Sequence, residues 1–479
     1  MKAFTEPLLS LAGFEEMTKT AEKSSGLISV TGCIDAQKSQ MIYAFGGHRK
    51  NKLIVTFGEQ KAKELYDEYS FFDKEVVYYP SKDVLFYQSD IRGNLLTAER
   101  IRALKAIREQ ERVTLVTTFD ALMNTMAPIE KMWENVLTLE QGQLLDLKEI
   151  QAALIRMGYE KEYQVQTMGQ FSVRGGILDV FPLTEENPIR IELWGDEIDT
   201  IRYFDCESQK SIENTDRVSI YPAAELVLSD EEKAGGIDKL KAEAKRVSDK
   251  LRKQMKTEEA HRVTVMADEL TEEWGELSMY AGMDAFLSYF FDERVGILDY
   301  FNPSDSLIFF DELTRCVEQG KLTETEFSES MKQRLAMGYI LPGQMNGLFT
   351  EKEIVAKLGK YSCIALGALD NKANGLHQLG SYGIHCQSVS PYNNSFELLI
   401  KDLKRYKKNG YRVILLSGSR TRAKRLSEDI TDQGITCFYT ENYDHELFEG
   451  QIMVCYGKVR RGFEYPILKF AVITESDIF

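Results

Sequence analysis

Apolar and polar positions along the first 120 residues follow two alternating periods. Short β-branched and apolar runs read as strands, at 26–30, 52–57, 75–79 and 113–119. Between them lie longer segments with helical spacing, at 38–45, 59–72 and 95–110. Apolar strands separated by helices of this length are typical of a parallel sheet covered on both faces. The pattern predicts an α/β domain over residues 1–128, of the kind that binds nucleotides.

The pattern changes after residue 128. A helix that we expect Asp146 to cap and Gly158 to end is followed by longer strands with alternating apolar positions, at 159–165, 170–182, 188–205 and 217–222. Such alternation indicates an antiparallel sheet with one face toward a core. We therefore predict a small antiparallel α+β domain at 129–222, inserted into the α/β domain.

Beyond residue 222 the sequence is helical and charged, until the apolar segment 306–312 returns to the α/β pattern. Acidic residues are interleaved with basic ones through the charged run, so we interpret it as a solvated helical face and not as a functional basic helix. We assign 223–380 to the completion of the first domain and 381–479 to a further small α/β domain. The chain stops soon after an apolar strand, which predicts that it is part of a longer protein.

Composition and charge narrow the class of protein. The 479 residues are 43% hydrophobic and 28% charged, as in ordinary globular proteins. The sequence has no apolar run of the roughly 18 residues that a membrane span needs, and acids stand where a signal peptide would be apolar. We therefore expect a cytoplasmic protein without membrane contact. The net charge of -16 argues against nucleic-acid binding by the whole surface, so any DNA contact would be local.

Cysteine and histidine usage argues against a metal or thiol site. The seven cysteines are scattered singly, no C-x-x-C pair occurs, and the five histidines are equally dispersed. Disulfide frameworks and zinc sites need cysteines or histidines at close, regular spacing. We therefore predict no metal and no cysteine nucleophile.

Residues 32–39, read GCIDAQKS, are one residue away from a phosphate-binding loop. Gly32, Lys38 and Ser39 fit the pattern G-x-x-x-x-G-K-[ST], but Gln37 replaces its second glycine. The glycines allow backbone N–H groups to turn toward phosphates, and a glutamine adds a side chain where the backbone must come close. The segment lies between a predicted strand and helix, where such a loop belongs. We interpret it as a degenerate nucleotide site.

Asp311 and Glu312 follow the four apolar residues 307–310. In ATPases of this type, an acidic strand end holds Mg²⁺ and orients water; the alternative is a buried strand that ends in two solvated acids. Together with residues 32–39, the pair indicates a RecA-like, P-loop NTPase-type domain in which Lys38 is paired with Asp311.

Hydrolysis also needs a second motor domain that contributes an arginine, and none is evident in the sequence. We therefore expect no catalytic residue and no bound ATP or Mg²⁺ in this chain.

The strand at 188–194 carries a candidate binding surface. Its apolar positions face one side, and Arg190, Glu192 and Trp194 face the other. Tryptophan and arginine lead protein-binding hot spots; the alternative is a tryptophan covered by a neighbouring domain and an arginine in an internal ion pair. Arg174 precedes a glycine pair at a bend or bulge. If its strand lies beside 188–194, the two arginines form a basic patch suited to an acidic partner.

Residues 158–212 resemble the second domain of the bacterial transcription-repair coupling factors (Mfd) and, less closely, that of the excision-repair helicase UvrB. The motifs VRGGILDVFP, IRIELWGDEID and FDCESQKSI carry the resemblance, and looser matches extend it over essentially the whole chain. It implies a UvrB-like amino-terminal module that has lost ATPase function and recruits UvrA, the damage-sensing subunit of nucleotide excision repair.

The resemblance also implies which residues contact UvrA. Two arginines and an aromatic residue of the family fall on Arg174, Arg190 and Trp194, although the aromatic is commonly phenylalanine. The parent protein would be an ATP-dependent DNA translocase that displaces stalled RNA polymerase. RNA polymerase, duplex DNA, ATP and Mg²⁺ would be bound by parts of the parent outside this chain.

The alternative is an active UvrB-type ATPase that binds damaged DNA. Two features count against it: the incomplete phosphate loop, and a segment between residues 82 and 93 that is too short for the long aromatic hairpin with which UvrB clamps DNA.

Overall fold

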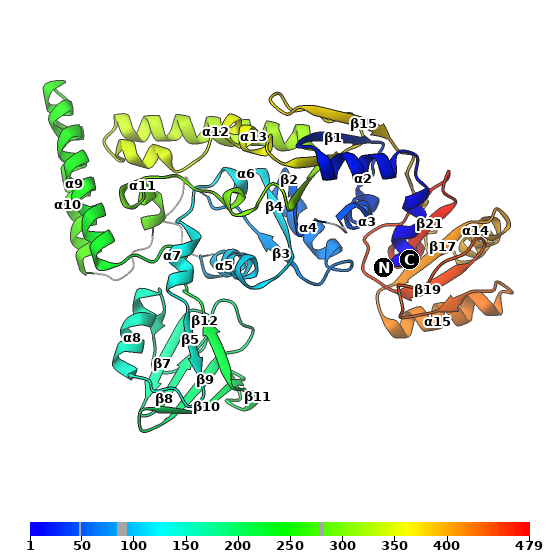
Figure 1. Ribbon diagram of the computed structural model, residues 1–479, viewed down its shortest axis with the longest axis horizontal. Coiled ribbons are helices and arrows are strands. Elements are labelled where there is room, and N and C mark those ends of the chain that lie inside the picture. The colour runs from blue at the N-terminus through cyan, green and yellow to red at the C-terminus, as the bar shows by residue number, and fades with distance from the viewer. Residues whose placement is uncertain (47–48, 84–92, 277–281) are drawn as a thin grey trace.

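The computed structural model describes residues 1–46, 49–83, 93–276 and 282–479. A large α/β unit occupies the middle of the molecule, with a small β-rich unit below it, a second α/β unit at one end and a helical hairpin at the other (Figure 1). The segment in which we expected no room for a DNA-clamping hairpin lies largely outside the described residues.

The central sheet has seven parallel strands in the order β15-β1-β14-β13-β2-β4-β3. Its strands are β1 (Gly26–Thr31), β2 (Asn51–Thr56), β3 (Val76–Tyr79), β4 (Val113–Thr118), β13 (Ser306–Asp311), β14 (Ser362–Leu366) and β15 (Gln378–Gly383). Strands β4 and β13 are buried at every position, because helices cover both faces. The predicted parallel α/β architecture is confirmed.

The helices around this sheet include those that connect its parallel strands, which a tight turn cannot do. They are α2 (Phe14–Lys23), α3 (Asp35–Phe45), α4 (Glu59–Tyr69), α5 (Gly93–Glu109), α12 (Leu313–Ala336) and α13 (Glu351–Leu358), with the short helices α1 (Lys2–Thr5), α6 (Phe119–Met123) and α7 (Ile129–Glu134).

The small unit contains a six-stranded sheet in the order β11-β10-β9-β8-β7-β6, antiparallel except for β6 and β7. Its strands are β6 (Glu160–Lys161), β7 (Gln170–Arg174), β8 (Ile177–Val180), β9 (Ile189–Trp194), β10 (Glu197–Phe204) and β11 (Ser211–Thr215). The pair β5 (Leu137–Glu140) and β12 (Arg217–Ile220) leads into and out of the unit.

Helix α8 (Leu147–Arg156) belongs to the same unit and begins and ends as predicted. The Asp146 carboxylate accepts hydrogen bonds from the N–H groups of Lys148 and Glu149, and Gly158 adopts a φ of +88° just beyond the helix.

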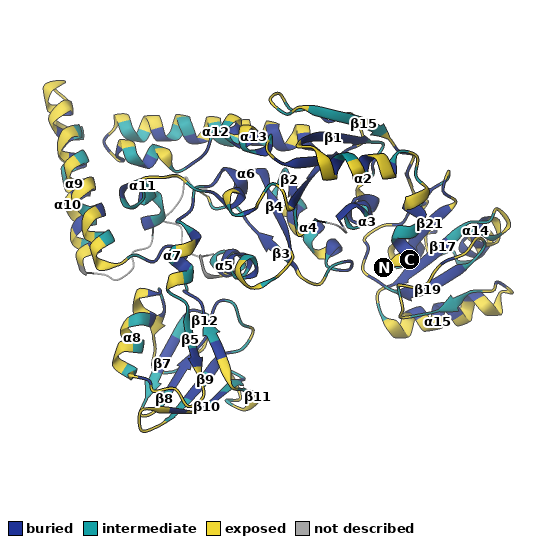
Figure 2. Cartoon of the chain, in the orientation of Figure 1, coloured by how far each residue is buried: buried dark blue, intermediate teal, exposed yellow. Residues whose placement is uncertain are grey.

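The charged run after residue 222 forms two antiparallel helices, α9 (Asp230–Lys253) and α10 (Thr257–Glu276). Ser229 and Glu232 cap α9 reciprocally. Much of the surface of both helices is exposed (Figure 2). Across the described ranges, no helix is both long and apolar enough to cross a membrane.

The last unit is a mixed sheet in the order β16-β20-β21-β17-β19-β18. It comprises β16 (Gln387–Ser388), β17 (Arg412–Ser417), β18 (Phe438–Tyr439), β19 (Ile452–Tyr456), β20 (Phe463–Tyr465), β21 (Phe470–Thr474) and the helices α14 (Phe396–Lys408), α15 (Arg420–Asp432) and α16 (Glu475–Ile478). One continuous apolar cluster joins this sheet to α3, α4 and the amino-terminal helix. The three boundaries drawn from the sequence, after residues 128, 222 and 380, stay a prediction.

Candidate functional site

Strand β9 presents alternate residues to its two faces, as predicted. Ile189 and Ile191 are fully buried against the core of the small unit, whereas Arg190 lies on the opposite face of the sheet. Trp194 ends the strand with 84% of its surface exposed. The alternative in which a neighbouring domain covers this tryptophan is wrong for the described chain.

The two arginines meet at an acid that the sequence did not single out. Strand β8 lies between β7 and β9, so Arg174 is not directly beside Arg190. Asp179 on β8 is 1% exposed and accepts hydrogen bonds from Nε and Nη2 of Arg190, at 2.7 and 2.8 Å, and from Nη2 of Arg174 at 2.9 Å. A signal was present in the sequence, because a lone aspartate in an otherwise apolar strand segment needs a partner.

Further contacts hold Arg190 in place. Its guanidinium donates to Oε1 of Gln209 at 2.8 Å and lies 4.3 Å from the ring centroid of Phe204. Its hydrogen bonds to Asp179 raise the pKa of Arg190, which stays charged. Only 12% of this side chain is exposed, against 36% for Arg174. Two arginines sharing one carboxylate leave one net positive charge, so the predicted basic patch is present in a partly neutralised form.

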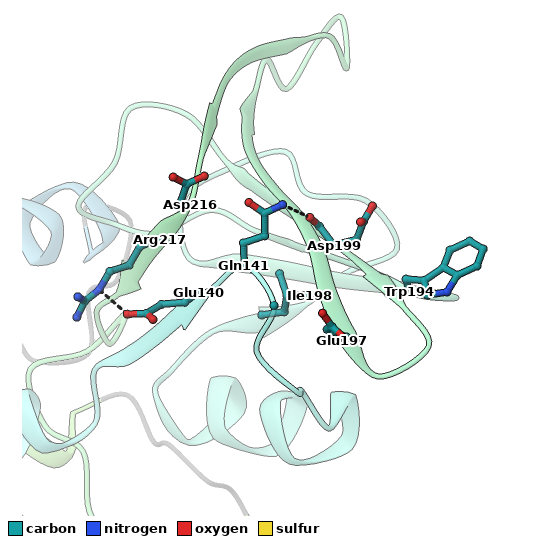
Figure 3. A pocket seen from close by; sticks show the side chains of 9 residues that line it. Glu140, Gln141, Trp194, Glu197, Ile198, Asp199, Asp216 and Arg217 are labelled. Carbon is teal, nitrogen blue, oxygen red and sulfur yellow. Dashed lines mark hydrogen bonds and ion pairs between the residues drawn. The ribbon is translucent and has the colours of Figure 1, made fainter.

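Trp194 stands at the rim of a surface hollow of about 610 Å³ (Figure 3). Its side chain points away from the hollow's other lining residues, which are Glu140, Gln141, Gly142, Glu197, Ile198, Asp199, Asp216 and Arg217. Gly195, with a φ of +65°, forms the tight turn that places Trp194 opposite Glu197 at the tip of the β9–β10 hairpin. The tryptophan is therefore presented outward from a well-defined turn.

The segment that we interpreted as a degenerate nucleotide site is mostly helical. Helix α3 begins at Asp35, so only residues 32–34 separate it from β1 and Lys38 lies inside the helix. The N–H groups of Gly32 and Cys33 donate to the carbonyls of Ala368 and Gly367, at 3.2 and 3.0 Å. A Cβ at Gly32, whose φ is +77°, would lie 2.1 Å from the carbonyl oxygen of Ile384. This glycine is therefore needed for chain packing.

Lys38 is 1% exposed and lies among three carboxylates. Its Nζ contacts Asp311 at 2.5 Å, Asp35 at 3.0 Å and Glu312 at 3.2 Å. Burial alone would lower the pKa of Lys38, but the interactions with Asp311, Asp35 and Glu312 together outweigh burial and raise it. The predicted pairing with Asp311 is present, and the alternative of two solvated acids is wrong for Asp311, which is 2% exposed.

The remaining residues of this site are also enclosed. The side chains of Gln37 and Ser39 are fully buried, and Thr56 donates to the second carboxylate oxygen of Asp311 at 2.9 Å. Glu312 adopts a left-handed backbone conformation, with a φ of +59°, at the start of α12. Residues 37–39 are therefore buried, whereas Asp35 stays largely exposed and pairs with both Lys38 and Lys61.

Comparison with known proteins assigns a family to the small unit. Residues 137–226 match the model of the UvrB interaction domain. This range contains the strands that carry Arg174, Asp179, Arg190 and Trp194.

The whole chain resembles larger proteins. It is 27% identical over 428 residues to the transcription-repair-coupling factor of Bacillus subtilis (strain 168), covering 89% of this chain and 36% of the relative. It is 26% identical over 479 residues to that of Staphylococcus aureus (strain MRSA252), covering 97% and 39%. The chain thus spans less than two fifths of the length of these relatives. The small unit thus matches the UvrB interaction domain, and most of the chain is similar to part of the transcription-repair-coupling factors.

Proposed function

We propose that this chain is a non-catalytic UvrB-homology module that recruits UvrA and so couples stalled transcription to nucleotide excision repair. The observation that carries the proposal is the match of residues 137–226 to the UvrB interaction domain. On the outer face of that unit, Arg174, Arg190 and Trp194 are the UvrA contacts.

The geometry of this face supports that role. An exposed tryptophan and a rigidly held arginine lose little side-chain freedom on binding, which favours affinity. Asp179 is buried and holds both guanidiniums from below the surface. It acts as a positioning residue for the two arginines.

The geometry around Lys38 supports the non-catalytic part of the proposal. A phosphate group needs free backbone N–H donors and an uncompensated cation. Here two N–H groups of the loop donate to carbonyls, and Lys38 is neutralised by three acids. Phosphates approaching this site would meet excess negative charge.

The wider role belongs to a longer parent. In the proposal, the parent is an ATP-dependent DNA translocase that displaces stalled RNA polymerase, and it binds ATP, Mg²⁺, duplex DNA and the polymerase through parts outside these residues. The chain described here supplies the UvrA-binding face.

UvrA capture by the immobilised chain tests the partner. The double variant Arg174→Ala, Arg190→Ala should lose capture, because a hot-spot residue contributes about 2 kcal/mol or more. The matched control is Arg156→Ala, an exposed arginine on α8 in the same unit, which should capture UvrA as the parent chain does. If the double variant captures UvrA as well as the parent chain does, the interface lies elsewhere.

Calorimetric titration with ATP and Mg²⁺ tests the non-catalytic part. The chain should give no binding heat. A micromolar site that disappears in Lys38→Met would instead support the active UvrB-type ATPase.

A further inference from the structure

The outer half of helix α9 carries a concentration of positive charge in an acidic chain. Residues 239–256 contain eight basic and two acidic side chains, a net charge of +6 in a chain whose total is -16. The basic residues are Lys239, Lys241, Lys245, Arg246, Lys250, Arg252, Lys253 and Lys256, and all eight are exposed.

The fold sorts these charges onto one side of the helix. Leu240, Ala244 and Leu251 are buried against α10 and its neighbours. At 100° per residue, the basic positions occupy the opposite half of the helix surface. Residues 239–253 extend over about 22 Å at 1.5 Å per residue. The result is a continuous basic face and not a scattered set of charges.

Internal partners leave this face largely uncompensated. Within the described residues, one of the eight basic side chains forms an ion pair, Lys239 with Asp292 at 3.0 Å. Of the two acids, Glu243 is occupied on the body side, where it accepts hydrogen bonds from Tyr289 and from the N–H of Gly343. Asp249 is the one exposed acid on the face.

Stabilisation of the helix itself accounts for only part of this pattern. Cations near a helix C-terminus interact favourably with the helix dipole, but the effect falls off within the last turn. Lys250, Arg252 and Lys253 lie in that turn. Lys239, Lys241 and Lys245 lie two to four turns earlier, where the dipole contributes little.

The position of the hairpin makes the face accessible. Helices α9 and α10 stand at one end of the molecule, and the end of the hairpin away from the chain connections projects beyond α12 (Figure 1). The turn that joins the two helices carries Met255, which is 87% exposed.

The composition of the face indicates which class of ligand it fits. Six of the eight basic residues are lysines, and lysine is depleted in protein–protein interfaces, whose cores are apolar or aromatic. Met255 is the one large apolar side chain among the exposed residues of 239–256. Phosphate backbones, in contrast, are bound through clustered Lys and Arg without an apolar core.

We propose that the outer face of α9 is a sequence-independent binding surface for the phosphate backbone of duplex DNA. Its length matches about 13 phosphate charges of a duplex, at one charge per 1.7 Å of helix axis. The surface is separate from the face that carries Arg174, Arg190 and Trp194, so this inference stands or falls independently of UvrA recruitment.

Fluorescence anisotropy with a labelled 30-base-pair duplex of arbitrary sequence tests the proposal. The chain should bind the duplex at about 50 mM salt, and log K should fall linearly with log salt, because binding releases counterions. Reversal of three exposed charges, in Lys241→Glu, Lys245→Glu, Lys253→Glu, should weaken binding at least tenfold and reduce the salt slope by about 3.

The matched control reverses three exposed lysines elsewhere, in Lys74→Glu, Lys352→Glu, Lys360→Glu, and so changes the net charge equally. It should bind the duplex within about twofold of the parent chain. Circular dichroism checks that the α9 variant keeps its helix content. If the α9 variant unfolds, the single substitutions Lys241→Gln and Lys245→Gln replace it, each expected to lower the salt slope by about 1.

Three results would overturn the proposal. One is no duplex binding by the parent chain at 50 mM salt, and another is equal loss in the α9 and control variants. The third is α9-dependent binding of polyglutamate without binding of the duplex, which would assign the face to an acidic protein.

Discussion

At the scale of single residues, Asp179 and Lys38 both form ion pairs with several partners, but one cluster lies at the surface and the other is buried. Asp179 holds Arg174 and Arg190 on the small unit, where both side chains keep part of their surface exposed. Lys38 is held by Asp311, Asp35 and Glu312 inside the central unit and has no exposed surface to offer. The difference lies in burial: a partly exposed cation can still meet a partner, whereas an enclosed one contributes to the fold.

Replacing Asp179 tests the positioning of the arginines. Asp179→Asn removes the charge that three guanidinium hydrogen bonds share, so we expect a loss of about 2–3 kcal/mol in the free energy of unfolding and weaker UvrA capture. Urea denaturation and the capture assay measure the two effects. Asp199→Asn, an exposed acid of the same unit, should change neither, and normal capture by Asp179→Asn would contradict the positioning role.

At the scale of elements, a buried ionic cluster connects the small unit to the central one. Glu225 follows β12 and accepts hydrogen bonds from Nε and Nη2 of Arg100 on α5, at 2.7 and 3.1 Å, and lies 3.0 Å from Nζ of Lys82. Arg100 is fully buried and stacks 4.0 Å from the ring centroid of Tyr79. The cluster fixes the segment through which the chain returns from the small unit.

Because of this cluster, the stability of the fold depends on pH. Burial would raise the pKa of Glu225, but Arg100 and Lys82 outweigh burial and lower it to about 2. A carboxyl whose pKa is lower in the folded state stabilises the fold above its ordinary pKa, and the contribution is lost as pH falls from about 4.5 toward 2.

We expect Glu225→Gln to lose about 3–5 kcal/mol at pH 7, because Arg100 is left buried without its counter-charge. Between pH 4.5 and 2 its stability should change less than that of the parent chain. Urea denaturation across this pH range measures both. A variant as stable as the parent chain at pH 7 would show that the cluster contributes no net stability.

At the scale of the whole molecule, one apolar cluster is shared between the central unit and one face of the last sheet, whose other face has a cluster of its own. The last sheet shares a core with the central unit, and the buried Phe4 packs edge-on against Phe71 and Phe72 within it. The hydroxyl of Tyr465 donates to Oε1 of Gln40 on α3 at 3.2 Å. The small unit has a core of its own.

Cooperative unfolding should follow this division. Native-state hydrogen exchange in urea should show β1, β17 and β21 opening together, because they share one apolar cluster. Phe4→Ala should lower the opening free energy of these strands by about 3–5 kcal/mol and leave β9 unchanged. Earlier exchange of β17 and β21 than of β1 would show that the last unit unfolds by itself.

Much of the fold could be read from local sequence. Apolar runs predict five of the seven strands of the central sheet, because strands buried on both faces have few polar positions. Strands β14 and β15 were not singled out from the sequence. The alternation along 188–194 predicts which side chains of β9 face outward, since the period of a strand is two residues. The start of α8 after Asp146 and its end before Gly158 can also be predicted, because capping interactions involve residues only a few positions apart.

The tertiary structure decided what depends on residues far apart in the chain. The incomplete loop at 32–39 shows in the sequence, but the start of α3 at Asp35 and the donation of loop N–H groups to residues 367–368 depend on packing across the sheet. Asp179 became a shared partner for two arginines only when β8 came to lie between β7 and β9.

The charged run after residue 222 is a second case in which the tertiary structure decides the outcome. In the sequence its acids and bases are interleaved, and we interpreted it as a solvated face without function. Folding into a helical hairpin turns one set of side chains toward the body and leaves a basic half-surface exposed on α9. Charge order along a chain is a local property, whereas charge on a surface depends on which half of a helix the tertiary structure buries.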